Sequence, residues 1–326
     1  MKALYVVAGP EGGRFRFDDA PVTDPGPGQA RVRVRASGLN RGVVMFLAAQ
    51  RGDGTRVFPM GIVEFAGEVE ALGEGVDGVS VGDRVMARGP GAAAECVVLD
   101  ARFLVPVPAG WSWQQAAAVP NVFVTSHDAV VTNGRLQRGE SLLVTGGASG
   151  VGTATLQIAR LLGASPVIAT TRTPDTKGAA LEELGADLIV NTTEPDWSDV
   201  VRKATDDKGV DLVIDTVGAP LLAGNLDAMA LCGRLVSVGR TGGTIDVIDL
   251  DLIALKRLQL IGVTFRTRTV EEDIACSRRF ADDLLGALDD GRLRPVLHGS
   301  FPWGEIEAAY ASMAEDNHIG KIVAVL

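Results

Sequence analysis

The sequence is poor in residues that form disulfides and bind metals. It has three cysteines, three histidines and two tyrosines among 326 residues. The cysteines are far apart and odd in number, which argues against a disulfide framework. No apolar run reaches the about 18 residues of a membrane-spanning helix, and the run at the N-terminus is too short for a signal peptide. We therefore expect a cytoplasmic protein with reduced thiols and no membrane partner.

Positive charge is also scarce. Lysine and arginine together number 31 against 41 aspartates and glutamates, so the formal net charge is −10. Nucleic acids and anionic membranes both favour a basic face, and this balance argues against either as a partner. The contents of hydrophobic residues, 46%, and charged residues, 22%, are ordinary for a globular protein, and the length suggests two domains.

The stretch Ser141–Leu162 organises the second half of the chain. A short apolar run leads into a turn with glycines at positions 146, 147, 150 and 152, and a helical stretch follows. A strand, a glycine-rich turn and a helix in this order direct backbone N–H groups toward a pyrophosphate. The match to G-x-G-x-x-G is imperfect because Ser149 replaces the middle glycine, and an ordinary tight turn is the alternative interpretation.

Strand and helix candidates continue to alternate after this turn. The strand candidates are Ser141–Thr145, Pro166–Thr170, Leu188–Val190, Leu212–Asp215, Arg234–Val238 and Gln259–Val263. Helical stretches fall between them, at Thr176–Leu184, Trp197–Ala204, Leu221–Leu231 and Asp249–Arg257. Such an alternation predicts an α/β fold with a doubly wound parallel sheet that binds a dinucleotide.

The end of the second strand indicates which dinucleotide binds. NAD sites place an acidic residue there for the ribose 2′-hydroxyl, whereas this strand ends without a carboxylate. Arg172 and Lys177 offer positive charge, and Thr171 offers a hydroxyl, which suits a 2′-phosphate. The sequence favours NADP(H), with solvated surface charges as the alternative interpretation of the two basic residues.

The region before residue 120 has a different pattern of predicted secondary structure. Short strand candidates separated by glycine-rich turns are typical of a small antiparallel barrel or sandwich. These candidates are Lys2–Val7, Ala30–Ala36, Ile62–Leu72, Arg84–Ala87 and Ala93–Leu99, followed by a helical stretch at Trp113–Ala129. In the tail, Glu271–Leu288 and Trp303–Glu315 are predicted helical, and Val296–Phe301 and Lys321–Leu326 are predicted extended. The last strand needs a partner, so we expect the tail to return to the N-terminal domain.

Many short motifs in one order resemble a known superfamily. They include Ala36–Asn40, Gly67–Val69, Val81–Val85, Val144–Gly146, Ser149–Gly152, Leu184–Asp187, Asp215–Gly218, Gly233–Val236 and Gly320–Val323. Together they resemble the zinc-free quinone oxidoreductase branch, related to zeta-crystallin, of the medium-chain dehydrogenase/reductase superfamily. The resemblance implies a chaperonin-10-like (GroES-like) β-barrel domain at residues 1–122 and 297–326. It further implies a Rossmann domain, with a doubly wound parallel sheet, at residues 123–296.

The resemblance also bears on metal use. The histidine that alcohol dehydrogenases place before the glutamate matching Glu64 is Val63 here, and no cysteine follows Asn40 closely. A zinc site needs three or four ligands, usually cysteine, histidine or a carboxylate, and no such set has plausible spacing. Cys96 is more readily interpreted as a buried thiol than as a ligand. We expect no metal.

The resemblance places two residues near the reacting groups. Asn40 matches a position whose amide N–H would stabilise negative charge on the acceptor oxygen, and a strand-end turn residue is the alternative. Thr125 matches a threonine at the nicotinamide end, with helix packing as the alternative. His127 is either a proton relay or a core residue, and Arg41 is expected to face solvent. A tyrosine proton donor is doubtful, because none lies at residues 46–56.

The resemblance also implies which residues contact the cofactor and how the chain associates with a second copy. The resemblance assigns Ser149, Gly150 and Val151 to the pyrophosphate, and Thr171, Arg172 and Lys177 to the 2′-phosphate. Cofactor contacts are also expected from Val217, Gly239, Arg240, Phe265, Arg266 and Lys321. The family commonly dimerises through its sixth strand, here Gln259–Val263, so we expect a homodimer, with a tetramer as the alternative.

The sequence and the resemblance together suggest an enzyme that reduces quinones or activated enones with NADPH and without metal. The first alternative is the same hydride chemistry on an enoyl thioester or a medium-chain enal. A protein that binds NADPH with little turnover is a further alternative. The acceptor pocket falls in Val43–Val63, where the chain resembles the family least, so the sequence does not separate these alternatives.

Overall fold

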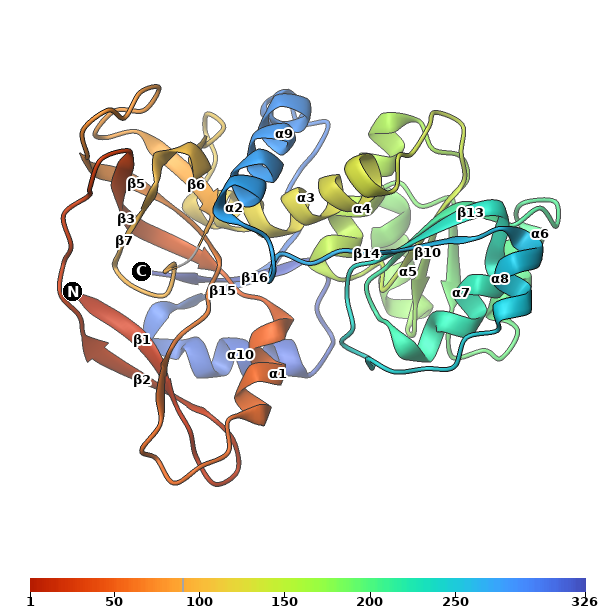
Figure 1. The fold of residues 1–326 in the computed structure, drawn as a ribbon, viewed down its shortest axis with the longest axis horizontal. Helices are drawn as coiled ribbons and strands as arrows, with labels where there is room; N and C mark the ends of the chain where they lie inside the picture. The colour runs from red at the N-terminus through yellow and green to blue at the C-terminus, as the bar shows by residue number, and fades with distance from the viewer. Residues whose placement is uncertain (90) are drawn as a thin grey trace. The chain divides into compact units, whose positions relative to one another are not determined.

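The computed structural model describes residues 1–89 and 91–326. Contacts within it divide these residues into two compact units (Figure 1). Unit 1 contains Met1–Val124 and Val270–Leu326, and unit 2 contains Thr125–Thr269. Among the described residues, no helix combines the length and the apolar character that crossing a bilayer requires.

Unit 2 is built on a six-stranded parallel sheet with the order β11-β10-β9-β12-β13-β14. The strands are β9 (Leu142–Thr145), β10 (Val167–Thr171), β11 (Leu188–Asn191), β12 (Val210–Asp215), β13 (Met229–Ser237) and β14 (Gln259–Gly262). In order of appearance this is 3-2-1-4-5-6, the doubly wound arrangement of a Rossmann domain. The predicted fold class of this half is confirmed.

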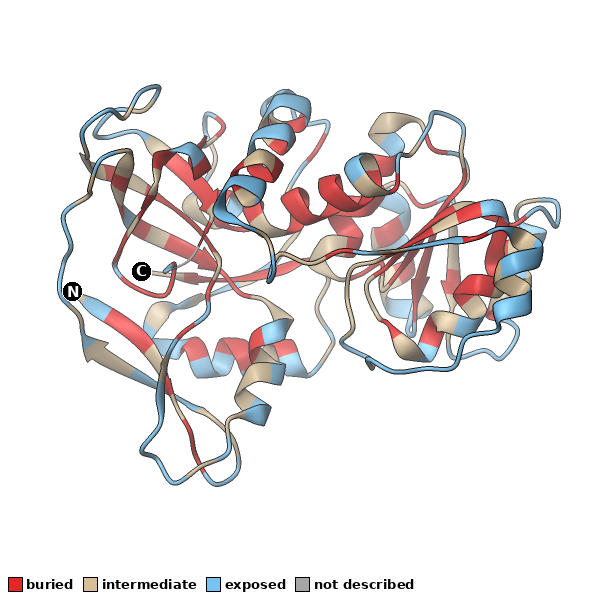
Figure 2. Ribbon diagram, in the orientation of Figure 1, coloured by how far each residue is buried: buried red, intermediate tan, exposed pale blue. Residues whose placement is uncertain are grey.

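In unit 2, one α-helix follows each of the first five strands in the chain. They are α4 (Gly150–Leu162), α5 (Pro174–Glu183), α6 (Trp197–Lys203), α7 (Leu222–Ala228) and α8 (Leu250–Lys256). Every residue of β9 is buried although its side chains alternate between faces, so both faces of the sheet are covered (Figure 2). The predicted helix at Leu221–Leu231 is too long, because Met229 already pairs with Val210 of β12 as a strand residue.

Unit 1 contains two sheets. A three-stranded sheet has the order β2-β1-β4, and a seven-stranded sheet has the order β15-β16-β3-β5-β6-β8 with β7 paired to β3. The strands are β1 (Lys2–Val7), β2 (Arg14–Asp19), β3 (Gln29–Gly38), β4 (Val57–Pro59), β5 (Glu64–Leu72), β6 (Arg84–Arg88), β7 (Cys96–Asp100), β8 (Val105–Pro106), β15 (Leu297–Pro302) and β16 (Lys321–Val325). β16 pairs antiparallel with β3, which confirms that the tail returns to the N-terminal domain.

The helices of unit 1 lie around these sheets and at their ends. They are α1 (Arg41–Ala49), α2 (Trp113–Ala117), α3 (Pro120–His127), α9 (Val270–Asp289) and α10 (Ile306–Ala314). α3 continues past the last residue of unit 1, and a π-helical segment, Asp128–Asn133, follows it. Sequence analysis did not predict α1, β2 or β4.

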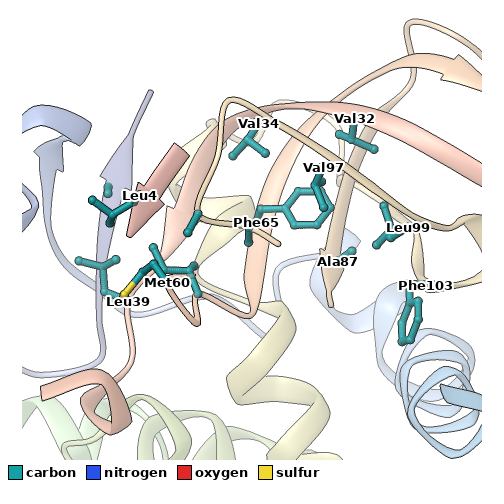
Figure 3. Close-up of a cluster of buried hydrophobic side chains, with 14 of the residues drawn as sticks. Leu4, Val32, Val34, Leu39, Met60, Phe65, Ala87, Val97, Leu99 and Phe103 are labelled. Carbon is teal, nitrogen blue, oxygen red and sulfur yellow. The ribbon is translucent and has the colours of Figure 1, made fainter. Parts of the chain in front are cut away.

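The core of unit 1 joins segments from both ends of the chain. Figure 3 shows part of it, with Phe65 of β5 beside Val97 of β7. Ile274 of α9 and Tyr310 of α10 belong to the same buried cluster. Because α9 packs here, contacts place the boundary of unit 1 at residue 270, whereas the sequence analysis placed it at residue 297.

Candidate active site

The turn between β9 and α4 has the form expected of a pyrophosphate site. Gly146 adopts a φ of 65°, and a Cβ on Gly152 would come within 2.5 Å of the carbonyl oxygens of Gly146 and Gly147. Ser149 caps α4, since its Oγ accepts a hydrogen bond from the Gly152 N–H at 3.0 Å. No acidic residue lies in the first turn of this helix. The turn therefore combines the positively polarised N-terminus of α4 with backbone that a phosphate group can approach closely.

Asp215 fixes the neighbouring edge of the sheet. It is buried at the end of β12, accepts from Thr145 Oγ1 at 2.6 Å, and accepts from the N–H groups of Val217 and Gly218. The carboxyl ends of β9 and β12 are thereby tied together, and Val217 is held at this edge. A Cβ on Gly239 would meet the Thr216 carbonyl oxygen at 2.1 Å, so only glycine fits at that neighbouring position.

The second strand ends in the residues assigned to the 2′-phosphate. Thr171 is the last residue of β10, and its Oγ1 accepts from the Thr173 N–H at 3.3 Å. Arg172 follows it and is exposed, and Lys177 is partly exposed in the first turns of α5. Within the described chain, no carboxylate stands at the tip of β10, as the sequence indicates.

An ion pair with a buried aspartate holds the loop that follows β14. Arg268 donates to Asp128 Oδ2 at 2.5 Å and to the Thr264 carbonyl oxygen at 3.2 Å, and it lies 4.4 Å from the centre of the Phe265 ring. Asp128 is buried in the π-helical segment. Of the two residues predicted here, Phe265 is partly buried and Arg266 is exposed.

Unit 1 brings a second set of polar side chains together. Lys321 Nζ donates to Glu64 Oε1 at 2.6 Å, to Asn40 Oδ1 at 2.9 Å and to the Leu39 carbonyl oxygen at 2.5 Å. The side chains of Glu64 and Lys321 are 0% and 5% exposed. Asn121 joins them through its backbone N–H, which donates to Glu64 Oε2 at 2.8 Å. We refer to Asn40, Glu64, Asn121 and Lys321 as the unit 1 cluster.

The side-chain amide of Asn40 is hydrogen-bonded within unit 1. Its Nδ2 donates to Glu64 Oε1 at 2.9 Å and, at 3.4 Å, to the Gly38 carbonyl oxygen. Both acceptors of this nitrogen thus belong to unit 1, and the amide oxygen accepts from Lys321 and from Asn121. Asn40 precedes α1 without capping it through its side chain. These bonds hold Asn40 within unit 1, and its role as an oxyanion donor stays a prediction.

Tyr310 lies under the unit 1 cluster. Burial raises the pKa of its phenol. The backbone amide of Asn40 lowers this pKa by a smaller amount, and the negative charge of Glu64 raises it further. The phenol is therefore protonated at neutral pH. Its ring stacks on Phe15 with 5.3 Å between the ring centres.

The other predicted residues are placed as follows. Thr125 is 9% exposed on α3, and His127 is buried two residues later. Arg41, predicted to face solvent, instead donates to Asp316 and to the Met313 carbonyl oxygen at 3.1 Å. Lys321 was predicted to reach the cofactor, whereas its ammonium group makes three hydrogen bonds within unit 1.

Sequence reasoning gave no role to Glu64, Asn121 or Arg88. Arg88 Nε donates to Asn121 Oδ1 at 3.1 Å, and its Nη1 donates to Asp273 at 3.0 Å. The sequence offers one signal for Asn121, an amide placed directly before the apolar run Val122–Val124. Among the described residues, no three His, Cys, Asp or Glu side chains lie together as a metal site would require.

Comparison with known proteins identifies the family. A model described as "Alcohol dehydrogenase GroES-like domain" matches residues 26–109, and one described as "Zinc-binding dehydrogenase" matches residues 150–280. The structure of an NAD-dependent alcohol dehydrogenase is 30% identical, with complete coverage of both chains and a TM-score of 0.84. The chain therefore belongs to the medium-chain dehydrogenase/reductase superfamily and is an oxidoreductase. Its fold is a GroES-like domain with a Rossmann domain.

Two further structures have the same fold over the whole chain. A quinone oxidoreductase of Pseudomonas syringae is 27% identical, with a TM-score of 0.86 and coverage of 100% of this chain and 99% of the other. A mycobacterial protein solved in complex with NADPH is also 27% identical, with a TM-score of 0.87 and complete coverage of both chains.

A curated relative is much longer. The spectinabilin polyketide synthase system protein NorB of Streptomyces orinoci is 35% identical over 307 residues, which are 91% of this chain and 13% of that protein. The first curated relatives are all longer proteins of this kind, of which the chain spans about a seventh or less.

Proposed function

We propose that the protein transfers a hydride from NADPH to a quinone or an activated enone, without a metal. The observation that carries this proposal is the unit 1 cluster. Its residue Asn40 directly precedes α1, and the cluster consists of two amides and a lysine paired with a buried glutamate. Zinc sites use thiolates, imidazoles and unpaired carboxylates, whereas the carboxylate of this cluster is paired with Lys321, so the cluster suits chemistry by hydrogen bonding without a metal.

The residues of unit 2 fit a nicotinamide dinucleotide. We propose that Gly150 and Val151, at the start of the Ser149-capped helix, hold the pyrophosphate with their backbone N–H groups. Val217, Gly239 and the loops that carry Arg240, Phe265 and Arg266 would line the remainder. When bound, the nicotinamide supplies a hydride. Thr125 would contact its amide end, while Lys321 acts within unit 1 and holds Asn40 in place.

The cofactor preference rests on charge at the end of β10. Arg172 and Lys177 would pair with a 2′-phosphate, and Thr171 would bond it. Replacing both basic residues by alanine should weaken NADPH binding at least about tenfold and leave NADH binding within twofold. Fluorescence titration of the reduced cofactors measures both affinities. Lys208→Ala, an exposed lysine on the same unit, serves as the control and should change neither. Equal losses for the two cofactors would contradict the assignment.

Turnover with separate acceptors tests the function. Purified protein treated with a chelator would be mixed with NADPH or NADH and with benzoquinone, phenanthrenequinone, hexenal or crotonyl-CoA. NADPH-specific reduction of a quinone, unchanged by the chelator, is the expected result, whereas turnover of hexenal alone would select the enal alternative. Activity that disappears with the chelator and returns with zinc would refute the metal-free mechanism. Binding of NADPH without reduction of any acceptor would favour a binding protein instead.

An enoyl thioester is the second candidate acceptor. The 35% identity with part of NorB, a polyketide synthase system protein, favours it. The required hydride chemistry is the same, because a thioester carbonyl activates the neighbouring double bond as a ketone does. Exclusive turnover of crotonyl-CoA in the same panel would select this candidate.

We also propose that the protein forms a homodimer through β14. This strand is at the edge of the sheet of unit 2, and an unpaired edge tends to associate with another strand. Leu260 of this strand is 40% exposed, which leaves apolar surface at the edge. Light scattering on the wild type and on Leu260→Arg should give a dimer and a monomer, respectively. A monomeric wild type would refute the proposal.

A further inference from the structure

We infer that Asn121 presents an amide N–H to the carbonyl oxygen of the acceptor, a role that the resemblance had given to Asn40. This inference rests on the proposed hydride transfer. The Asn121 side chain is partly exposed and makes two hydrogen bonds. Its Oδ1 accepts from Arg88 Nε at 3.1 Å, and its Nδ2 donates to Asn40 Oδ1 at 3.0 Å.

The orientation of both amides follows from the charged groups at the two ends. Lysine and arginine side chains only donate hydrogen bonds. Lys321 therefore requires the oxygen of Asn40 on its side, and that oxygen in turn requires the nitrogen of Asn121. At the other end, Arg88 requires the oxygen of Asn121. The two requirements agree, so neither amide can be flipped without losing a hydrogen bond to a cation.

Counting hydrogens then separates the two asparagines. The Nδ2 of Asn40 has two acceptors inside unit 1, Glu64 Oε1 at 2.9 Å and the Gly38 carbonyl oxygen at 3.4 Å. The Nδ2 of Asn121 carries two hydrogens and has one acceptor, Asn40 Oδ1, among residues 1–89 and 91–326. Of the two, Asn121 is thus the residue with a donor left for a ligand.

The surroundings make this N–H a strong and fixed donor. Arg88, whose charge is balanced by Asp273 at 3.0 Å, polarises the amide through its oxygen. The backbone of Asn121 is held as well, since its N–H donates to Glu64 Oε2. Asn121 also precedes Thr125 by one helical turn, so the two side chains share a face of α3. Thr125 is the residue proposed to contact the nicotinamide.

The donor has a defined part in the reaction. A hydride adds to the β-carbon of the enone, and the electrons of the C=C bond move onto the carbonyl oxygen, which becomes an enolate. The Asn121 N–H bonds this oxygen more strongly as its charge grows. A proton from solvent then adds to the α-carbon. Each acceptor consumes one hydride and one proton, and a saturated carbonyl compound results.

The test compares Asn121→Val with the wild type. Loss of one oxyanion donor should lower kcat about 100-fold. The deuterium isotope effect with NADPH labelled at the transferred position should rise, because hydride transfer becomes more rate-limiting. The affinity for 4-nitrophenolate, an enolate mimic that is not reduced, should fall about tenfold in the presence of NADP⁺. Asn317→Val, an exposed asparagine in the same unit, is the control and should change none of these.

Other outcomes would overturn the inference. A lower melting temperature and lower activity, with an unchanged isotope effect and unchanged phenolate affinity, would show that Asn121 is only structural. Unchanged kinetics would do the same. If Asn121→Val does not fold, Asn121→Asp keeps the acceptor for Arg88 and should show the same losses. A wild type that reduces no acceptor refutes the proposed function, whereas phenolate binding still reports on the Asn121 contact.

Discussion

Replacing Lys321 by methionine should destabilise unit 1 strongly. The substitution keeps a long, unbranched side chain and removes the ammonium group that bonds Glu64, Asn40 and a backbone carbonyl oxygen. Glu64 is fully buried, so its charge would be left with only the N–H donors of the two asparagines. Removing one partner of a buried ion pair costs about 3–5 kcal/mol of the free energy of unfolding, since the remaining charge is not compensated.

Equilibrium unfolding in urea, followed by circular dichroism, measures this cost. A loss of that size shifts the midpoint by about 1–2 M. Lys2→Met is the matched control, because Lys2 pairs with Asp19 at 3.0 Å while both side chains are more than half exposed. It should cost less than about 1 kcal/mol.

A double variant tests the reasoning itself. Lys321→Met combined with Glu64→Gln removes both charges, so its cost should fall short of the summed single costs by at least about 2 kcal/mol. Additive costs, or a Lys321→Met cost no larger than that of Lys2→Met, would show that the pair does not contribute as a buried ion pair.

Three further predictions concern other parts of the chain. Gly152→Ala should cost more than about 2 kcal/mol and weaken NADPH binding, whereas Gly286→Ala, in a helix with open space around it, should be neutral or stabilising in urea unfolding. A disulfide reagent at pH 8 should modify the exposed Cys232 faster than the buried Cys96, because burial and a hydrogen bond to Glu70 raise the pKa of the Cys96 thiol; equal rates for the two cysteines would contradict this. Lys256→Met should cost about 1–3 kcal/mol, since the ammonium group donates to three carbonyl oxygens at 2.6–3.3 Å, and an unchanged urea midpoint would contradict this.

The Rossmann half was predictable because its signals are local. Buried parallel strands are short apolar runs, and a glycine-rich turn before a helix marks the first of them. The missed elements lack such signals. α1 begins without a side-chain cap and contains two adjacent valines, and it starts three residues after β3, whose last residues pair with the distant β16.

The site was less predictable than the fold. Ser149 and the residues at the end of β10 could be assigned from their place after a strand. The unit 1 cluster could not, because its members come from β5, β16, the end of β3 and the start of α3. Which amide hydrogen is available to a ligand depends on the oxygens to which Lys321 and Arg88 donate. These hydrogen bonds form only when the segments come together in the folded chain.

Stability and catalysis can be separated at the Arg88 end of this network. Arg88→Met removes the donor for the Asn121 oxygen, and Asn121→Val removes the acceptor for Arg88, so each single variant loses the same hydrogen bond. The double variant should therefore cost about 1 kcal/mol less than the sum of the single costs in urea unfolding. Its kcat, in contrast, should equal that of Asn121→Val, because the N–H that contacts the acceptor belongs to Asn121. A double variant with the kcat of Arg88→Met would place the catalytic contribution in the arginine and not in the amide.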